Sequence, residues 1–267
     1  MGDFHLSART AEEAVQQSLE HFGVARIALA TSFGAEDQVL TDMIARANPA
    51  ARIFTLDTGR LFQETYDTMQ RSMDRYHIAY EVCAPEAADI AALVAKDGPN
   101  LFYLSVENRK ACCNVRKMKP LRKELGTVDA WICGLRRDQS MTRTEVDLVS
   151  WDAEFGIYKI CPLFDWSEQQ VWDYIKNNDV PYNALHDQGF PSIGCAPCTR
   201  AVLPGEDIRS GRWWWESPEH KECGLHRSPA HRNLYPSEPT TDFHPSKPNP
   251  GFSGTPGLPA TPTKEKA

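Results

Sequence analysis

Four of the chain's eight cysteines lie in two close pairs, and cysteine pairs commonly ligate metals. Cys112 and Cys113 are adjacent, whereas two residues separate Cys195 from Cys198. A Cys-x-x-Cys pair chelates one zinc ion comfortably, but adjacent side chains diverge and would strain the backbone at a single tetrahedral ion. A [4Fe–4S] cluster offers several irons to four thiolates. We therefore interpret the four cysteines as one iron–sulfur site, with zinc, a redox dithiol or unrelated thiols as alternatives.

Segment 31–38 has the composition of a loop that binds an anion. It follows a short apolar run and contains Ser32, Phe33 and Gly34, then Glu36 and Asp37. Where such a loop joins a parallel strand to a helix, backbone N–H groups and a hydroxyl can hold a phosphate or sulfate. The loop lacks the lysine of a nucleoside triphosphatase P-loop. The alternative is an ordinary turn whose acidic residues favour the start of a helix.

A second polar turn follows the next apolar run. It consists of Asp57, Thr58, Gly59 and Arg60. One interpretation is a simple turn in which the glycine takes a positive φ. The functional interpretation is a second wall of the same crevice, because the carboxyl ends of parallel strands meet at one edge of a sheet.

Arginines are concentrated in two later segments. Arg136 and Arg143 follow a further strand-like run, and Arg209 and Arg212 precede three consecutive tryptophans. A guanidinium binds phosphate or sulfate oxygens in pairs, so we predict that these four arginines contact an anionic substrate. The alternative is a pair of solvated basic loops.

Cys223 is the candidate nucleophile. It is not needed for a four-thiolate site, and Lys221, His226 and Arg227 place positive charge around it. Positive charge lowers the pKa of a thiol and makes it a better nucleophile. The alternative is a cysteine without a chemical role. The three remaining cysteines lie in or beside apolar runs and are assigned to packing; they are Cys83, Cys133 and Cys161.

Apolar runs alternate with helical patterns over the first half of the chain. This alternation is typical of βαβ units, and it predicts an α/β fold with a Rossmann-like, mostly parallel twisted sheet flanked by helices. Residues 146–160 alternate weakly and indicate a hairpin at the sheet edge. The expected strands are 24–30, 52–56, 79–82 and 130–134; the expected helices are 9–22, 39–47, 62–76, 86–96, 119–125 and 168–178.

Length and composition narrow the class of protein. The 267 residues suit one α/β domain, predicted over 1–235 with a mobile catalytic segment around 218–230. Residues 236–267 are rich in Pro, Ser, Thr and Gly, and we expect a disordered tail. A net charge of −7 argues against general nucleic-acid binding. The absence of a signal-like start and of a long apolar run predicts a cytoplasmic protein with no membrane contact.

Taken together, these residues resemble the assimilatory adenylyl-sulfate (APS) reductase family, the thioredoxin-dependent iron–sulfur branch of the PAPS/APS reductases. The resemblance covers roughly residues 20–227 and leaves the Pro-rich tail outside. Each motif alone is weakly or moderately specific, but their joint occurrence is highly specific. The segments that carry it are 32–37, 56–60, 112–113, 195–198 and 222–226.

The resemblance implies a PP-loop-type, adenine nucleotide α-hydrolase-like fold and the reduction of APS to sulfite and AMP. It implies that Cys223 attacks the sulfur of APS to give an S-sulfocysteine. Thioredoxin, or a glutaredoxin-like reductant, then releases sulfite. It also implies a [4Fe–4S] cluster on the four paired cysteines that is not redox-active in turnover. Lys117 would couple cluster and substrate electrostatically, and His226 would add charge at the nucleophile.

Three other readings stay open at this point. PAPS reductase differs mainly by a pocket for a 3′-phosphate, and relatives of that kind lack the cluster cysteines. A second alternative is a PP-loop ATP pyrophosphatase acting in tRNA thiolation. Enzymes of that kind have a Ser-Gly-Gly-x-Asp-Ser loop, which residues 31–37 do not reproduce. A non-catalytic iron–sulfur sensor or zinc-stapled binding module leaves Cys223 unexplained. The sequence leaves the oligomeric state open, a homo-oligomer included.

Overall fold

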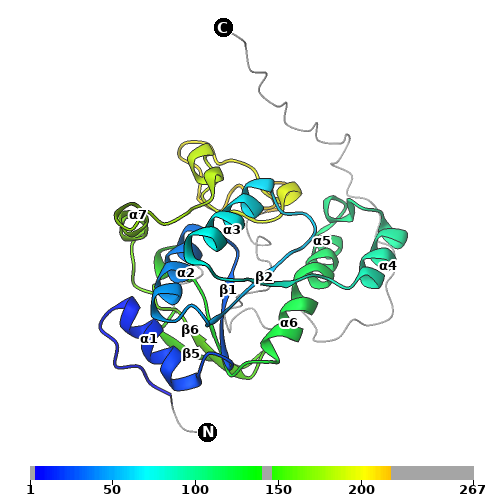
Figure 1. Cartoon of the computed structure of the whole chain (residues 1–267). Helices are drawn as coiled ribbons and strands as arrows, with labels where there is room; N and C mark the ends of the chain where they lie inside the picture. Colours follow the sequence, from blue (N-terminus) through cyan, green and yellow to red (C-terminus); the bar gives the residue numbers. More distant parts are fainter. Residues whose placement is uncertain (1–3, 140–145, 218–267) are drawn as a thin grey trace.

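The computed structural model describes residues 4–139 and 146–217 of the chain. These residues form a three-layer α/β fold, with helices on both faces of a central sheet (Figure 1). The main elements in chain order are α1 (Ala11–Phe22), β1 (Ile27–Thr31), α2 (Ala35–Ala47), β2 (Arg52–Leu56), α3 (Gln63–Tyr76), β3 (Glu81–Cys83), α4 (Ala87–Asp97), α5 (Val106–Cys113), α6 (Lys119–Leu125), β4 (Ala130–Ile132), β5 (Val149–Asp152), β6 (Ile157–Ile160) and α7 (Glu168–Asn177).

The six strands lie in the order β3-β2-β1-β4-β6-β5. Every neighbouring pair is parallel except β5 and β6, which form an antiparallel hairpin with Trp151 opposite Tyr158. Strands β2 and β4 flank β1 on opposite sides, so the order of the sheet reverses direction between β1 and β4. In open α/β sheets, a crevice for ligands forms at the carboxyl ends of strands at such a point.

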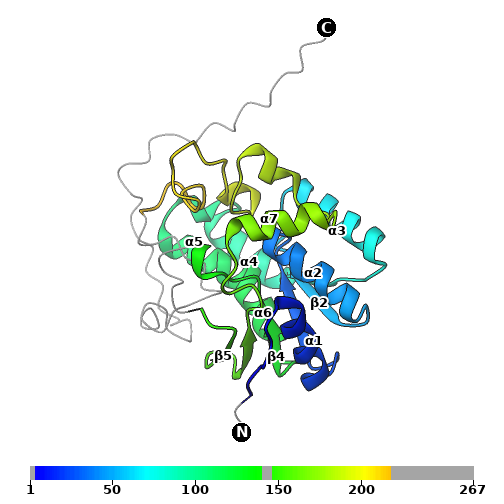
Figure 2. The same ribbon diagram turned by 90° about the vertical axis from the view of Figure 1, so that its left-hand side faces the viewer.

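Two apolar cores lie on opposite faces of the sheet. Alternate residues of one strand supply both, because successive side chains point to opposite faces: Leu29 belongs to the larger core and Ala28 to the smaller one. Helices α1, α2 and α7 cover the larger core, and α6 covers the smaller one with Leu121 and Leu125. Figures 1 and 2 show these helix layers from two sides, with α1 at the end of the molecule opposite the segment after α7.

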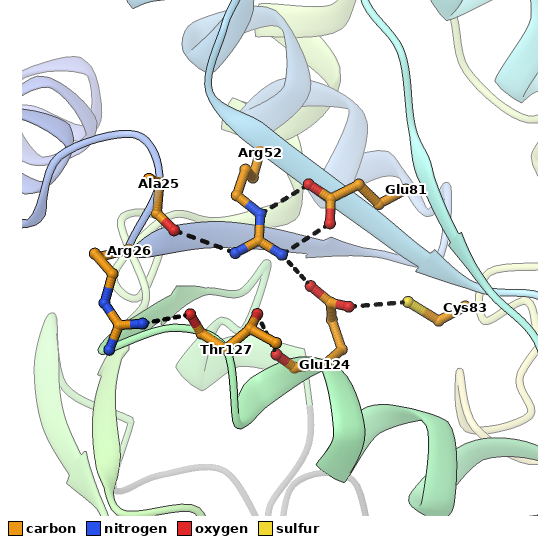
Figure 3. Close-up of polar contacts among 7 residues, drawn as sticks. All are labelled: Ala25, Arg26, Arg52, Glu81, Cys83, Glu124 and Thr127. Carbon is orange, nitrogen blue, oxygen red and sulfur yellow. Dashed lines mark hydrogen bonds and ion pairs between the residues drawn. The ribbon is translucent and has the colours of Figure 1, made fainter.

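A network of charged side chains holds the amino-terminal ends of the central strands. The Arg52 guanidinium donates hydrogen bonds to the carboxylates of Glu81 and Glu124, which join β2 to β3 and to α6. Arg26 reaches the Thr127 carbonyl, and Glu124 also accepts from the thiol of Cys83 (Figure 3). This end of the sheet is therefore locked by side chains, and the opposite end carries the loops of the site.

The chain between α4 and α6 contains a run of helix that the sequence patterns did not indicate. A single 3₁₀ turn, Leu101–Tyr103, precedes α5, and the Ser105 hydroxyl caps α5 by accepting from the Asn108 N–H. Between α5 and α6 the backbone widens into a π-helical turn, Asn114–Met118. Such turns are rare and often lie at functional sites. This one directly follows Cys112 and Cys113.

The predicted fold class is confirmed, since the sheet is mostly parallel and helices flank it. Residues 149–160 form the expected edge hairpin. The first strand begins at Ile27, because residues 24–26 form a turn. None of the helices within the described residues has both the length and the apolar character needed to cross a bilayer. The predicted segment 218–230 and tail 236–267 lie outside the described residues.

Candidate active site

A cleft of about 900 Å³ opens at the carboxyl ends of β1, β2 and β4. This is the point where the strand order reverses, as expected for an open α/β sheet. The loops after β1 and β4 touch at its floor: a Cβ atom on Gly134 would lie 2.5 Å from Asp37 Oδ1 and 2.9 Å from the Glu36 Cβ. Only glycine allows the two loops to approach so closely. The volume suits a small organic ligand of nucleotide size.

The loop after β1 is held by its own carboxylate. Asp37 Oδ2 accepts hydrogen bonds from the Ser32 N–H at 2.6 Å and the Ser32 hydroxyl at 2.7 Å. Burial raises the pKa of Asp37 to about 6, and the hydrogen bonds from Ser32 act in the opposite direction. Ser32 and Gly34 both line the cleft, as the anion-loop interpretation requires. The Ser32 hydroxyl already donates to Asp37, so in this arrangement it offers a ligand its lone pairs.

Phe33 contributes to the loop in a different way from its neighbours. Its backbone has a φ of 60°, the left-handed region that L-residues seldom adopt. Its ring is buried and packs edge-to-face on Tyr80, with ring centres 5.1 Å apart. Phe33 does not line the cleft. Its side chain fixes the loop to the core, and direct contact with a ligand is left to the residues on either side.

Three of the four arginines predicted from the two later segments are described, and all three line the cleft. The Arg136 guanidinium is buried and pairs with Glu36 at 2.8 Å, so much of its charge is already balanced. Arg212 is also buried; it donates to the Ile193 carbonyl at 3.2 Å and lies over the Trp213 ring. Arg209 lines the cleft from the same segment. Arg143 lies outside the described residues.

The four paired cysteines line one small cavity beside the cleft. Cys112 and Cys113 come from the end of α5, and Cys195 and Cys198 flank a 3₁₀ turn, Ala196–Cys198. All four are free thiols; three are buried and Cys113 is half-buried. Burial raises the pKa values of Cys112 and Cys198. Within the described residues, no group of three or more His, Cys, Asp or Glu is arranged around a single metal ion.

Cations surround the thiols of this cavity. Its lining includes Arg60, Arg109, Arg116 and Lys117. Arg116 lowers the pKa of Cys112, partly offsetting the effect of burial, and Arg212 and Lys117 act on Cys198 in the same direction. The cavity therefore combines four thiols with positive charge that favours their thiolate forms.

The turn after β2 lies at the cysteine cavity and not in the cleft. The Thr58 hydroxyl lies 3.3 Å from Cys195 Sγ, and the Thr58 carbonyl accepts from Arg116 at 2.6 Å. The Arg60 carbonyl accepts from the Ala196 N–H at 2.8 Å. Asp57 accepts from the Gly59 N–H and from the Tyr66 hydroxyl. These four predicted residues, 57–60, are absent from the cleft lining; two of them, Thr58 and Arg60, contact the second cysteine pair and the turn between its members instead.

Lys117 connects the two regions. Among the described residues, it is the one that lines both the cleft and the cysteine cavity. Lys117 belongs to the π-helical turn, which directly follows Cys113. That Lys117 acts between a metal site and a substrate stays a prediction. Cys223 and His226, the other predicted catalytic residues, lie outside the described residues.

Several residues of the site gave no clear signal in the sequence. His186 lines the cleft, and its buried Nε2 atom has no hydrogen-bond partner among the described residues. Burial lowers the pKa of this histidine, which favours the neutral imidazole. Arg109 and Arg116 line the cysteine cavity from three residues before Cys112 and four residues after it. Residues three or four positions apart lie on the same side of a helix, so this spacing was the sequence signal that could have placed both arginines near Cys112.

The chain has an adenine nucleotide α-hydrolase-like fold, which other solved structures share. Yeast FAD synthetase shares the fold, with a TM-score of 0.50 and 14% identity over 72% of this chain and 66% of that chain. A PAPS reductase from Candida auris, solved as a phosphate complex, gives a TM-score of 0.61 and 27% identity over 75% of this chain and all of that chain.

The family is narrower than the fold. Residues 26–201 match the phosphoadenosine phosphosulfate reductase domain, and the chain belongs to this family. The chain is 52% identical to an adenosine 5′-phosphosulfate reductase of Allochromatium vinosum over 220 residues, which are 82% of this chain and 84% of that protein. It is also 52% identical to a reductase of the same name from Neisseria meningitidis serogroup B, over 74% of this chain and 81% of that protein.

Proposed function

We propose that this protein reduces adenosine 5′-phosphosulfate (APS) to sulfite and AMP in sulfate assimilation. Family membership and 52% identity to reductases of that name support the activity. The structural observation that carries the proposal is the position of Lys117, in the wall between a nucleotide-sized cleft and a four-thiol cavity. A purely structural metal site would not need a cation that also faces the cleft.

The proposed reaction has two transfers. The Cys223 thiolate attacks the sulfur of APS, the sulfur–oxygen bond to AMP breaks, and AMP leaves with the electron pair of that bond. The product is an S-sulfocysteine. A thioredoxin-type thiolate then attacks the Cys223 sulfur and expels sulfite, and the second thiol of the donor resolves the mixed disulfide. The donor dithiol is oxidised to a disulfide, and sulfur is reduced from sulfate to sulfite.

The cleft residues have two tasks in this proposal. An anionic thiolate must approach an anionic phosphosulfate, so the site must supply positive charge where the two meet. Lys117, Arg209 and Arg212 line the cleft and are assigned to this task. Ser32 and Gly34 line the cleft in the βα loop, and we assign them to the substrate's anionic group; the Ser32 N–H and hydroxyl, which donate to Asp37 here, would then donate to the anion.

The four cavity cysteines fit an iron–sulfur cluster by the chemistry of their donor set. Four thiols from two distant segments line one cavity, no disulfide consumes them, and cations offset the charge that their thiolates would carry. Four thiolates are the ligand set of a [4Fe–4S] cluster. We propose that Cys112, Cys113, Cys195 and Cys198 hold it. When bound, the cluster would supply a fixed electrostatic field beside the cleft, and no electrons in turnover.

The second candidate substrate is PAPS, which carries an added 3′-phosphate. The solved Candida auris structure is that of a PAPS reductase, so the fold serves that substrate too. APS is favoured because the four cavity cysteines are present and because the reductases at 52% identity are named for it.

The test is intact-protein mass spectrometry with peptide mapping, without any thiol donor, after incubation with APS and separately with PAPS. The expected result is one sulfonate adduct on Cys223 with APS alone. Cys223→Ser should form no adduct and retain its iron. An adduct with PAPS as well would make the protein a dual-substrate reductase. Iron-loaded protein that forms no adduct with either nucleotide would refute the proposed reaction and favour a sensor or binding module.

A further inference from the structure

A buried ion pair joins the cysteine-bearing helix to the end of the described chain. Arg109 on α5 donates from Nε to Glu216 Oε1 at 3.0 Å and from Nη2 to Glu216 Oε2 at 2.7 Å. The two side chains are 1% and 3% exposed. This two-point geometry fixes orientation as well as distance. It also spans 107 positions of sequence, so it is a tertiary contact and not a feature of one helix.

The segment that carries Glu216 forms a turn and is bonded to the second cysteine pair. The Trp213 N–H donates to the Cys198 carbonyl at 3.1 Å, and the Glu216 N–H donates to the Trp213 carbonyl at 2.8 Å. The Trp213 ring is buried and faces two guanidinium groups, Arg109 at 4.6 Å and Arg212 at 4.8 Å. Trp213 has a φ of 42°, a backbone conformation that surrounding contacts must maintain.

This arrangement touches both functional regions. Arg109 lines the cysteine cavity, and Trp213 lines the cleft. Cys223 comes seven positions after Glu216 in the sequence.

We propose that Arg109 and Glu216 are a positioning pair for the nucleophile. The pair attaches segment 213–216 to α5, so the chain leading to Cys223 starts from a fixed point beside both the cleft and the cysteine cavity. This inference rests on the proposed function. A buried ion pair is seldom more stabilising than apolar side chains of similar volume, so stability alone does not explain its presence here. Its two-point geometry defines a single orientation, which apolar side chains would not do.

The experiment separates positioning from stability by using two variants of the pair. Glu216→Gln keeps the shape and removes the charge; the double variant R109M/E216M replaces both partners with apolar side chains. The control is Glu154→Gln, which removes the carboxylate of the exposed Arg122–Glu154 pair. Each protein is assayed for iron content, Tm and AMP affinity. The rate of Cys223 S-sulfonation is followed by mass spectrometry in a single turnover at saturating APS, and alkylation by iodoacetamide reports the intrinsic reactivity of the thiol.

We expect Glu216→Gln to slow S-sulfonation at least tenfold, with iron content, AMP affinity and the alkylation rate within twofold of the parent. The double variant should recover the parent Tm but stay slow, because packing is restored without the two-point contact. Glu154→Gln should match the parent in every assay.

Two results would overturn the positioning role. One is a double variant that reacts at the parent rate, which would show that the pair merely avoids an unbalanced buried charge. The other is a rate that falls only in proportion to iron content. If Glu216→Gln does not fold, the double variant alone decides between these outcomes. A parent protein that forms no adduct would instead refute the proposed function, and with it this inference.

Discussion

The cleft and the cysteine cavity lie side by side but are built by different means. The cleft is a product of sheet topology: its floor is the carboxyl ends of β1, β2 and β4, and its volume of about 900 Å³ can admit a nucleotide. The cysteine cavity owes little to the sheet. Its walls come from α5, the π-helical turn and a 3₁₀ turn, and it is far smaller.

The comparison separates what each region can contribute. The cleft is lined by charges of both signs, with Arg136 already paired to Glu36, and it suits a ligand that arrives and leaves. The cavity holds four thiols among cations and has no room for a nucleotide, so it suits a permanently bound group. Because Lys117 alone among the described residues lines both, substitutions on either side of it should have separable effects.

The largest effect is expected in the cavity. Cys195→Ser removes one of the four proposed ligands, and the protein should lose its iron completely and with it all activity. Cys83→Ser is the matched control, because Cys83 lies on the edge strand β3 and contacts Glu124. Iron and acid-labile sulfide per chain are the measurements. Full iron content in Cys195→Ser would contradict the four-ligand assignment.

The second-largest effect on the reaction is expected at Lys117, which lines both the cleft and the cysteine cavity. Lys117→Ala should retain iron but slow S-sulfonation by about 10²-fold, the usual cost of removing one group that stabilises transition-state charge. Lys119→Ala is the control, since Lys119 lies two residues further on and pairs with Asp89 on the surface. Single-turnover mass spectrometry gives the rate. An unchanged rate would remove Lys117 from the chemistry and leave the two regions independent.

A smaller effect is expected at the cleft floor. Gly134→Ala forces a methyl group against Asp37 and Glu36, and overpacking of this kind typically costs about 1–3 kcal/mol of unfolding free energy. The control is Gly126→Ala, whose nearest contact would be 3.4 Å from a backbone oxygen. Urea unfolding measures both. Equal stability of the two variants would show that the β1 and β4 loops separate readily.

The smallest effect is a pH dependence of the unfolding free energy that arises from Asp37 at the cleft floor. Burial raises the pKa of Asp37 from 3.8 to about 6, so the carboxylate is harder to form in the folded chain than in the unfolded chain. The stability that this group contributes is complete below pH 3.8 and is lost as the pH rises through 6. Relative to Asp37→Asn, the parent should therefore lose roughly 1.4 kcal/mol between pH 5 and pH 8. Unfolding curves that keep a constant offset across this range would show that Asp37 titrates alike in both states.

The sequence predicts the sheet well, because parallel strands that are buried on both faces are apolar along their length. It also predicts Ser32 and Gly34 at the cleft, since a βα loop must lie at the carboxyl end of its strand. Two local features were not predicted from the sequence. The direction of the Phe33 side chain depends on a left-handed backbone at a residue that rarely adopts one. The π-helical turn after Cys113 has no periodicity of its own to detect.

Contacts between distant segments account for the rest. Residues 57–60 were expected to form a second wall of the cleft, but hydrogen bonds to Cys195, Ala196 and Arg116 hold them at the cysteine cavity. The Arg109–Glu216 pair joins residues 107 positions apart, and nothing in the local sequence of either partner identifies the other. Such pairings depend on the completed fold and not on local patterns.

The distance in sequence between the two cysteine pairs has a consequence for assembly. Cys113 and Cys195 are 82 positions apart, and β4, β5, β6 and α7 lie between them. We therefore expect the cavity to close late in folding, after the strands between the two cysteine pairs have joined the sheet. A group bound to all four thiols would tie off this long loop. Once the sheet has formed, the ends of this loop are already close together, so closing it costs little further entropy. Iron loading would then report on the folding of the whole second half of the chain.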